Sequence, residues 1–269
     1  RLLGRSIGVL VAVPCAFFLY KKVLGRRLVR RLVLLFALGG LQGLMGWLMV
    51  ASGLVDAPHV SHYRLTLHLG LGFLLFGYAT WLAIEQTLGG FVITGGWPRL
   101  RRAVVAFTAV AGVTALSGGL VAGLRAGHGF PTFPLMAGAW VPAGLTALSP
   151  TWRNGFDNVI TVMFQHRVLG VAVLVFAIAM AIAARTSAVP RHARIGFDLI
   201  VATVFAQVTL GIATVLMHVP VAIASAHQGN AALVFAAALY TSYALGRWPE
   251  QMELPEGFRS TPDAVPQAT

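Results

Sequence analysis

Acidic residues and cysteine are both scarce in this chain. Its 269 residues include 8 Asp and Glu, against 20 Lys and Arg, and a single cysteine. One cysteine forms no internal disulfide, and it excludes a cysteine-rich metal cluster. Because Cys15 stands in an apolar stretch, we interpret it as a small buried hydrophobic residue.

The few acidic residues avoid the middle of the apolar runs. Asp56, Glu85, Asp157 and Asp198 stand at the ends of such runs, and Glu250, Glu253, Glu256 and Asp263 stand near the C-terminus. A proton-coupled transporter or pump uses a carboxylate inside the membrane, so this distribution argues against both classes. The sequence also contains no phosphate-binding loop, no Ser/His/Asp set and no zinc signature.

Apolar sequence is what the chain has in abundance. Hydrophobic residues make up 57% of it and charged residues 10%, and the mean hydropathy is +0.78. A membrane span needs about 20 apolar residues, and seven such runs are present. They cover residues 3–24, 32–54, 65–84, 103–124, 159–184, 195–217 and 219–245. We therefore predict an all-α fold, a polytopic membrane helical bundle.

The formal net charge of +12 is concentrated in every second loop. These loops carry Lys21, Lys22, Arg26, Arg27, Arg30 and Arg31, then Arg99, Arg101 and Arg102, then Arg185, Arg191 and Arg194. In a soluble protein such a charge would suggest nucleic acid, but the positive-inside rule explains it here. We predict a lipid-embedded protein of the bacterial cytoplasmic membrane or mitochondrial inner membrane. Its C-terminus is inside, and nucleic acid is not a partner.

Two segments outside the spans have distinctive compositions. Residues 125–157 form the longest predicted outer loop, and its prolines and aromatic residues indicate an interfacial cap over the helices. They are Phe130, Pro131, Phe133, Pro134, Trp140, Pro142, Pro150 and Trp152. Residues 248–269 are polar and proline-rich, which predicts a disordered tail.

Three histidines lie inside predicted spans, where an ionisable side chain is costly unless it binds something. They are His68, His166 and His227. At 1.5 Å per residue, all three lie roughly 6–12 Å below the outer surface. Two imidazoles at matched depth on facing helices are suited to axial ligation of a haem. The alternative for each is a hydrogen bond to a neighbouring helix.

Two arginines accompany these histidines. Arg64 is one helical turn from His68 on the same face, well placed to pair with a haem propionate. Arg167 points about 100° away from His166 and would reach a propionate only by snorkelling. The remaining histidines, for which a solvated or interfacial role is expected, are His59, His62, His128, His192 and His218. The intramembrane amides Gln42 and Gln207 are interpreted as hydrogen-bonding links between helices.

A weak but ordered internal repeat divides the chain. Arg1 to Gly4 resembles Arg167 to Gly170, Gln42 and Gly46 match Gln207 and Gly211, and His68 lines up with His227. The repeat predicts two homologous four-helix halves, residues 1–102 and 103–247. Since His166 directly precedes Arg167, it also predicts a histidine directly before Arg1. That histidine and the first helix of the N-terminal half are expected to lie outside this sequence.

Several motifs together resemble those of the haem A synthase family, of the mitochondrial and alphaproteobacterial type. They are residues 38–54 (LGGLQGLMGWLMVASGL), 60–65 (VSHYRL) followed by His68, 121–127 (VAGLRAG), 132–136 (TFPLM), 149–154 (SPTWRN), 164–167 (FQHR) and 226–228 (AHQ). The resemblance extends over nearly the whole chain to about residue 245.

This resemblance implies an enzyme that oxidises a ring methyl of haem O to the formyl group of haem A for terminal oxidases. It implies a haem b between His166 and His227, and the substrate haem O at His68 and the histidine before Arg1. An essential glutamate is implied upstream of Arg1 as well, so we expect this stretch alone to be inactive. The implied partners are a ferredoxin-like electron donor, haem O synthase and oxidase assembly factors.

A second function remains open from the residues alone. Two histidines saturate the axial positions of a haem iron, an arrangement that suits a b-type cytochrome that carries electrons or holds haem without modifying it. Composition and spacing do not separate this reading from the enzyme. The motifs favour the enzyme.

Overall fold

The computed structural model describes residues 2–51, 60–89 and 97–246. Arg1, Asp56, His59 and the tail 248–269, each of which carried an expectation above, lie outside the described residues.

Long helices account for most of the described chain, as the composition predicts. They are α1 (Leu2–Tyr20), α2 (Arg26–Ala51), α3 (His62–Leu88), α4 (Pro98–Gly123), α7 (Val159–Arg185), α8 (Arg191–Leu216) and α9 (Val221–Ala244). Six of them, α2 to α4 and α7 to α9, are long and apolar enough to cross a membrane. The remaining predicted span, residues 3–24, corresponds to α1, whose apolar part, Ser6–Tyr20, is shorter than the other six.

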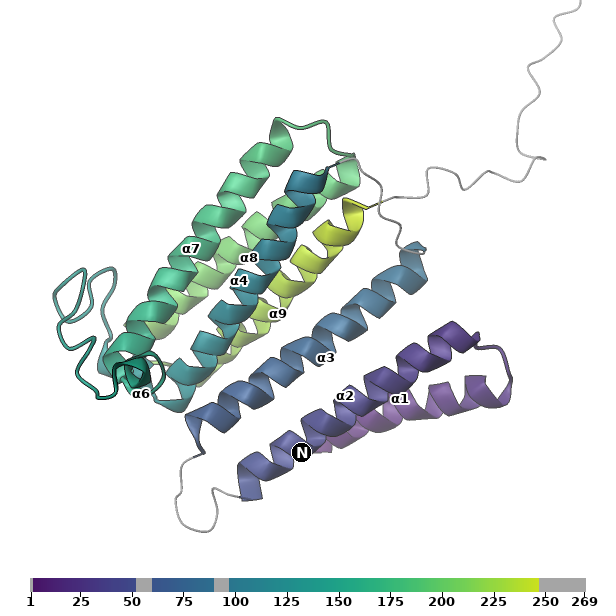
Figure 1. Cartoon of the computed structure of the whole chain (residues 1–269), viewed down its shortest axis with the longest axis horizontal. Coiled ribbons are helices and arrows are strands. Elements are labelled where there is room, and N and C mark those ends of the chain that lie inside the picture. Colours follow the sequence, from purple (N-terminus) through teal and green to yellow (C-terminus); the bar gives the residue numbers. More distant parts are fainter. Residues whose placement is uncertain (1, 52–59, 90–96, 247–269) are drawn as a thin grey trace, which may run out of the picture.

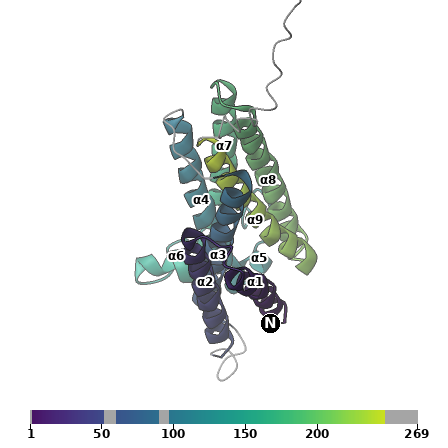
Figure 2. The same cartoon turned by 90° about the vertical axis from the view of Figure 1, so that its right-hand side faces the viewer.

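Helices α4, α7, α8 and α9 pack together as a four-helix bundle (Figure 1). Its core includes the fully buried side chains of Val104, Phe107, Phe197 and Ile200. Helix α3 contacts this bundle through α4 and α9, and α2 contacts the opposite side of α3. The α1–α2 hairpin is thus the outermost part, in front of the other helices in Figure 2.

Small residues let α3 approach α4 closely. A Cβ atom added at Gly123 would lie 2.5 Å from the Cβ of His62, and one added at Gly119 would lie 3.1 Å from the Cα of Thr66. The hydroxyl of Tyr243, at the end of α9, donates to the carbonyls of Leu88 and Gly89. Helix α4, the first of the predicted C-terminal half, therefore packs against α3, the last of the N-terminal half. The contact is made by the face of α4 that carries the glycines.

The segment between α4 and α7 contains α5 (Ala126–Gly129), a 3-10 turn (Thr151–Arg153) and α6 (Asn154–Asp157). Met136 from this segment is buried against Ala126 and Met163, so the segment covers the N-terminal end of α7 as predicted. Trp140 and Trp152 remain 73% and 65% exposed. Exposed tryptophans at the end of a membrane bundle are typical of the membrane interface.

Asn158 joins this segment to the start of α7. Its side-chain oxygen accepts from the backbone N–H groups of Ile160 and Thr161, which have no partner within the helix. Its amide group donates to the carbonyl of Gly144 and to the side chain of Asn154. The cap therefore sets where α7 begins, and with it the depth of His166.

Candidate functional site

The three membrane histidines lie at matched depths. His68 and His227 each follow the first residue of their helices, His62 of α3 and Val221 of α9, by six positions. His166 follows the first residue of α7, Val159, by seven. At 1.5 Å per residue, each is about 10 Å along its helix. The three histidines therefore occupy similar positions along their helices, and their depth below the outer surface stays a prediction.

His166 is oriented by Ser117 of α4. The hydroxyl of Ser117 donates to the carbonyl of Thr114 over 2.7 Å and lies 2.8 Å from Nδ1 of His166. Because the hydroxyl proton is used by Thr114, its oxygen accepts from Nδ1–H. Nε2 of His166 is therefore unprotonated, and its lone pair is available to a metal.

His227 is oriented by the backbone and side chain of Gln207 in α8. Its Nδ1 donates to the Gln207 carbonyl over 3.0 Å, and its Nε2 lies 3.3 Å from the Gln207 amide nitrogen. Asn230 donates to the Gln207 side-chain oxygen over 2.8 Å and to the Thr203 carbonyl over 2.8 Å. The amide orientation is thereby set, and the lone pair on Nε2 of His227 accepts from the Gln207 amide N–H.

The rings of His166 and His227 face each other across the bundle. Their centroids are 6.4 Å apart and their planes are inclined by 83°. Two imidazoles that bind one metal from opposite sides, with bonds of about 2 Å, have centroids about 6 Å apart. Within the described residues no group of three His, Cys, Asp or Glu side chains is placed to enclose a metal ion. The pair therefore fits a metal that brings its own equatorial ligands, as haem iron does.

His68 lies in a matching environment between α2 and α3. Its Nε2 is 3.5 Å from the Gln42 amide nitrogen, and a Cβ atom added at Gly46 would lie 3.1 Å from its Cε1. His227 has the same relation to Gln207 and to Gly211, where the Cε1 distance is 2.9 Å. The Gln, Gly and His of α2–α3 therefore reproduce those of α8–α9.

His68 and Gln42 border a cavity of about 480 Å³ between α3 and α9. Its other lining residues are Leu69, Gly72, Phe73, Phe76, Ser225, Gln228, Gly229 and Ala232. Gly43 and Gly46 are not among them. Gly46 lies against the ring of His68 instead.

The two arginines occupy different environments. Arg64 is exposed near the N-terminal end of α3, one turn from His68. Arg167 donates to the carbonyls of Phe130 and Leu135, over 2.8 and 3.3 Å. Its guanidinium thus holds the outer segment onto α7. The reach of Arg167 to a haem propionate stays a prediction.

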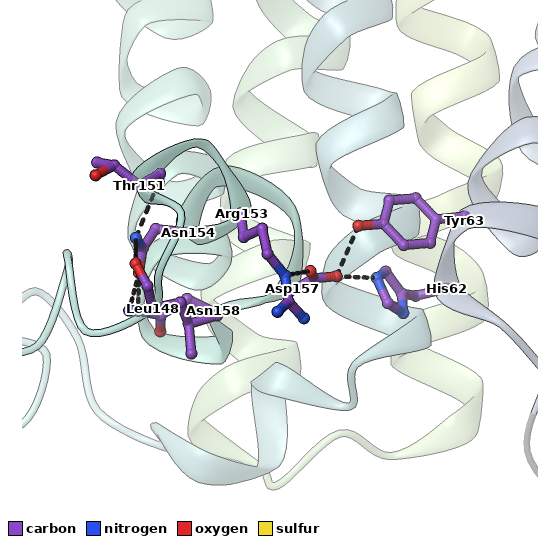
Figure 3. A network of polar contacts seen from close by, with 8 residues as sticks. All are labelled: His62, Tyr63, Leu148, Thr151, Arg153, Asn154, Asp157 and Asn158. Carbon is purple, nitrogen blue, oxygen red and sulfur yellow. Dashed lines mark hydrogen bonds and ion pairs between the residues drawn. The ribbon is translucent and has the colours of Figure 1, made fainter.

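A polar network joins the outer segment to the start of α3 (Figure 3). Asp157 accepts from Tyr63 Oη over 2.7 Å and from Arg153 Nε over 2.9 Å, and it lies 3.1 Å from Nε2 of His62. The hydrogen bonds from Tyr63 and then Arg153 hold the pKa of the Asp157 carboxyl below its ordinary value. His62 was expected to be solvated or interfacial; its side chain is 19% exposed and is part of this contact.

We expect Asp157→Asn to lower the melting temperature at neutral pH. A carboxylate with a depressed pKa stabilises the fold above its unfolded pKa, ordinarily 3.8, and loses that contribution as the pH falls through its folded pKa. The difference in melting temperature between wild type and variant should therefore shrink below about pH 4. Asp198→Asn, in the ion pair with Arg185, is the control. A pH-independent difference for Asp157→Asn would contradict this reading.

Ser117 and Asn230 are the residues that the sequence analysis missed. Neither residue is singled out by the sequence patterns described above. A polar residue three positions after an intramembrane histidine would have been a usable signal for Asn230, because such residues share a helix face. Nothing comparable marks Ser117, whose partner lies 49 positions away.

Comparison with known proteins agrees with this arrangement. The COX15-CtaA family model, described as cytochrome oxidase assembly protein, matches residues 1–239. A heme A synthase of Nitrosospira multiformis is 42% identical over 249 residues, covering 92% of this chain and 70% of the relative. The heme A synthase of Nitrosomonas eutropha is 41% identical over 247 residues, with coverages of 89% and 68%.

The heme A synthase of Parvibaculum lavamentivorans is 47% identical over 169 residues, covering 62% of this chain and 48% of the relative. The family match spans both histidine clusters, and the first relative aligns over nearly the whole described bundle. The chain therefore belongs to the COX15-CtaA family of cytochrome oxidase assembly proteins, and the relatives to which it is similar are haem A synthases.

Proposed function

We propose that this protein is a haem A synthase, a membrane oxidoreductase that converts a ring methyl of haem O into the formyl group of haem A. The main observation in support is that a Gln–Gly–His cluster occurs twice. One copy consists of Gln42, Gly46 and His68, and the other of Gln207, Gly211 and His227. Two equivalent clusters suit two haems, of which one is the substrate. A family of cytochrome oxidase assembly proteins and relatives named heme A synthase support this assignment.

We assign a haem b to the C-terminal half, residues 103–247. His166 and His227 would be its axial ligands, with both Nδ1 atoms held by the protein. The Gln207 amide, 3.3 Å from Nε2 of His227, would have to turn away for that atom to bind iron. Bound there, the haem would supply reversible one-electron chemistry. Ser117 and Gln207 then act on the ligands by setting their tautomers and raising their basicity.

The N-terminal half, residues 1–102, would receive haem O. His68 would supply one ligand, the repeat predicts the other directly before Arg1, and Arg64 would pair with a propionate at the outer surface. Gly46, which lacks a side chain, leaves room for the ring of His68 beside α2. The catalytic acid of the family would likewise be contributed from upstream of Arg1.

The orientation follows from the distribution of charge. We propose that the ends of α3, α7 and α9 nearest the three histidines face outwards, and that the basic loops and the C-terminus face inwards. The membrane would be the bacterial cytoplasmic or mitochondrial inner membrane. A ferredoxin-like electron donor would act there, with haem O synthase and oxidase assembly factors as partners.

Expression of the full-length protein in cells that make haem O but lack haem A synthase tests the proposal. We expect haem A to appear in extracted haems, identified by its mass and its α-band. A membrane b-type cytochrome that only carries electrons is the alternative, and it would leave haem O unconverted. A full-length protein that binds haem yet produces no haem A in these cells would overturn the proposed activity.

A further inference from the structure

A chain of hydrogen bonds between α8 and α9 ends on Nε2 of His227. The amide nitrogen of Asn230 donates to the backbone carbonyl of Thr203 over 2.8 Å, which identifies this atom as the nitrogen. Its other N–H donates to the side-chain oxygen of Gln207, also over 2.8 Å. The amide nitrogen of Gln207 is therefore the atom that faces Nε2 of His227, at 3.3 Å. A backbone carbonyl thus fixes which end of the Gln207 amide meets the histidine.

The other ring nitrogen of His227 agrees with this chain. Its Nδ1 donates to the backbone carbonyl of Gln207 over 3.0 Å, so Nε2 of the neutral ring carries the lone pair. That lone pair accepts from the side-chain amide of the same residue. Gln207 therefore engages both nitrogens of His227, one through its backbone and one through its side chain. The nitrogen that iron would need is already in use.

His166 is held differently, although its ring lies in a similar place. A Cβ atom added at Gly118 would lie 3.1 Å from Cε1 of His166, and one added at Gly211 would lie 2.9 Å from Cε1 of His227. Ser117 engages Nδ1 of His166, but within the described part of the chain no hydrogen bond reaches its Nε2. The two candidate axial ligands thus differ in whether a side chain holds the iron-binding nitrogen.

We propose that the Gln207 side chain competes with haem iron for His227, which makes His227 the displaceable axial ligand and His166 the permanent one. This inference rests on the proposed function, which assigns a haem b to these two histidines. A buried acceptor that loses its donor is strongly disfavoured, so the Gln207 amide stabilises His227 whenever that residue is away from iron. Asn230 strengthens the competition because it holds the amide in place. Gln207 and Asn230 are positioning residues, since neither is a ligand.

Carbon monoxide tests the proposal, because it binds a ferrous haem with two histidine ligands only after one of them has left. The protein is the full-length chain with His68→Ala, so that only the C-terminal haem contributes, and the rate of binding is measured after reduction. Gln207→Leu keeps the backbone carbonyl but removes the amide. It should slow binding by about fivefold or more, because His227 away from iron then lacks a donor. Asn230→Ala should slow binding by a smaller factor, and haem transfer to excess apomyoglobin should slow in the same order.

The direction of the change separates competition from packing. A substitution that only loosened the packing around His227 would speed carbon monoxide binding, whereas loss of a competitor slows it. Thr209→Val, at an exposed position of α8 where the hydroxyl bonds the Phe205 carbonyl, is the matched control and should stay within about twofold of the parent protein.

Asn230→Ala decides the matter alone if Gln207→Leu fails to fold. Rates equal to or above those of the parent protein in the folded variants would overturn the inference. Haem A production by the wild-type full-length protein would leave the proposed function standing in that case. Absence of the low-spin b-type spectrum from the parent protein would overturn the haem assignment and this inference with it.

Discussion

His166→Ala and His227→Ala are each expected to remove the C-terminal haem from the purified protein. Loss of an axial ligand should exceed the about 10–100-fold effect of an outer-shell change. The low-spin b-type absorption spectrum should therefore disappear in both variants. The 83° angle between the two ring planes further predicts the strongly anisotropic low-spin EPR signal of perpendicular axial imidazoles in the ferric wild type.

Two further variants make this test specific. Ser117→Ala should retain the spectrum but weaken haem binding by about 10-fold or more, because Nδ1 of His166 loses its acceptor. His128→Ala, at an exposed position of α5, should behave as wild type. Persistence of the low-spin spectrum in both His166→Ala and His227→Ala would refute the assignment of the C-terminal ligands.

His68→Ala in the full-length protein is expected to reduce haem A formation to background while the C-terminal haem remains. The reason is that His68 lies in the other cluster and touches neither His166 nor His227 through any contact described above. Haem content should fall from two per chain to one, and the remaining spectrum should be that of the b-type haem. Pyridine haemochrome analysis and extracted-haem chromatography measure the two quantities separately.

The choice of control for this experiment follows from the structure. The sequence favoured both His59 and His62 as dispensable residues. His62, however, packs against Gly123 and is bonded to Asp157, so its replacement should affect stability as well. His128→Ala is the better match. Equal yields of haem A from wild type and His68→Ala, each with two haems bound, would exclude His68 as a substrate ligand.

The sequence alone determined the class of the protein, its helices and its candidate ligands. Length and apolarity dictate where a chain can cross a bilayer, and the predicted spans 103–124, 159–184 and 195–217 correspond to α4, α7 and α8, with C-terminal ends that agree to within one residue. A histidine inside a span is costly enough to stand out without any neighbours. The repeat could likewise be recognised, since equal spacing on equal helices is a property of the chain.

Only the tertiary structure decided which polar groups act on these histidines. Ser117 reaches His166 and Asp157 reaches His62 because helices distant in sequence lie side by side, which no local spacing encodes. Arg167 binds carbonyls of the outer segment because that segment folds back over α7. Asn230 of α9 acts on Gln207 of α8 only because helix packing places its amide beside that side chain.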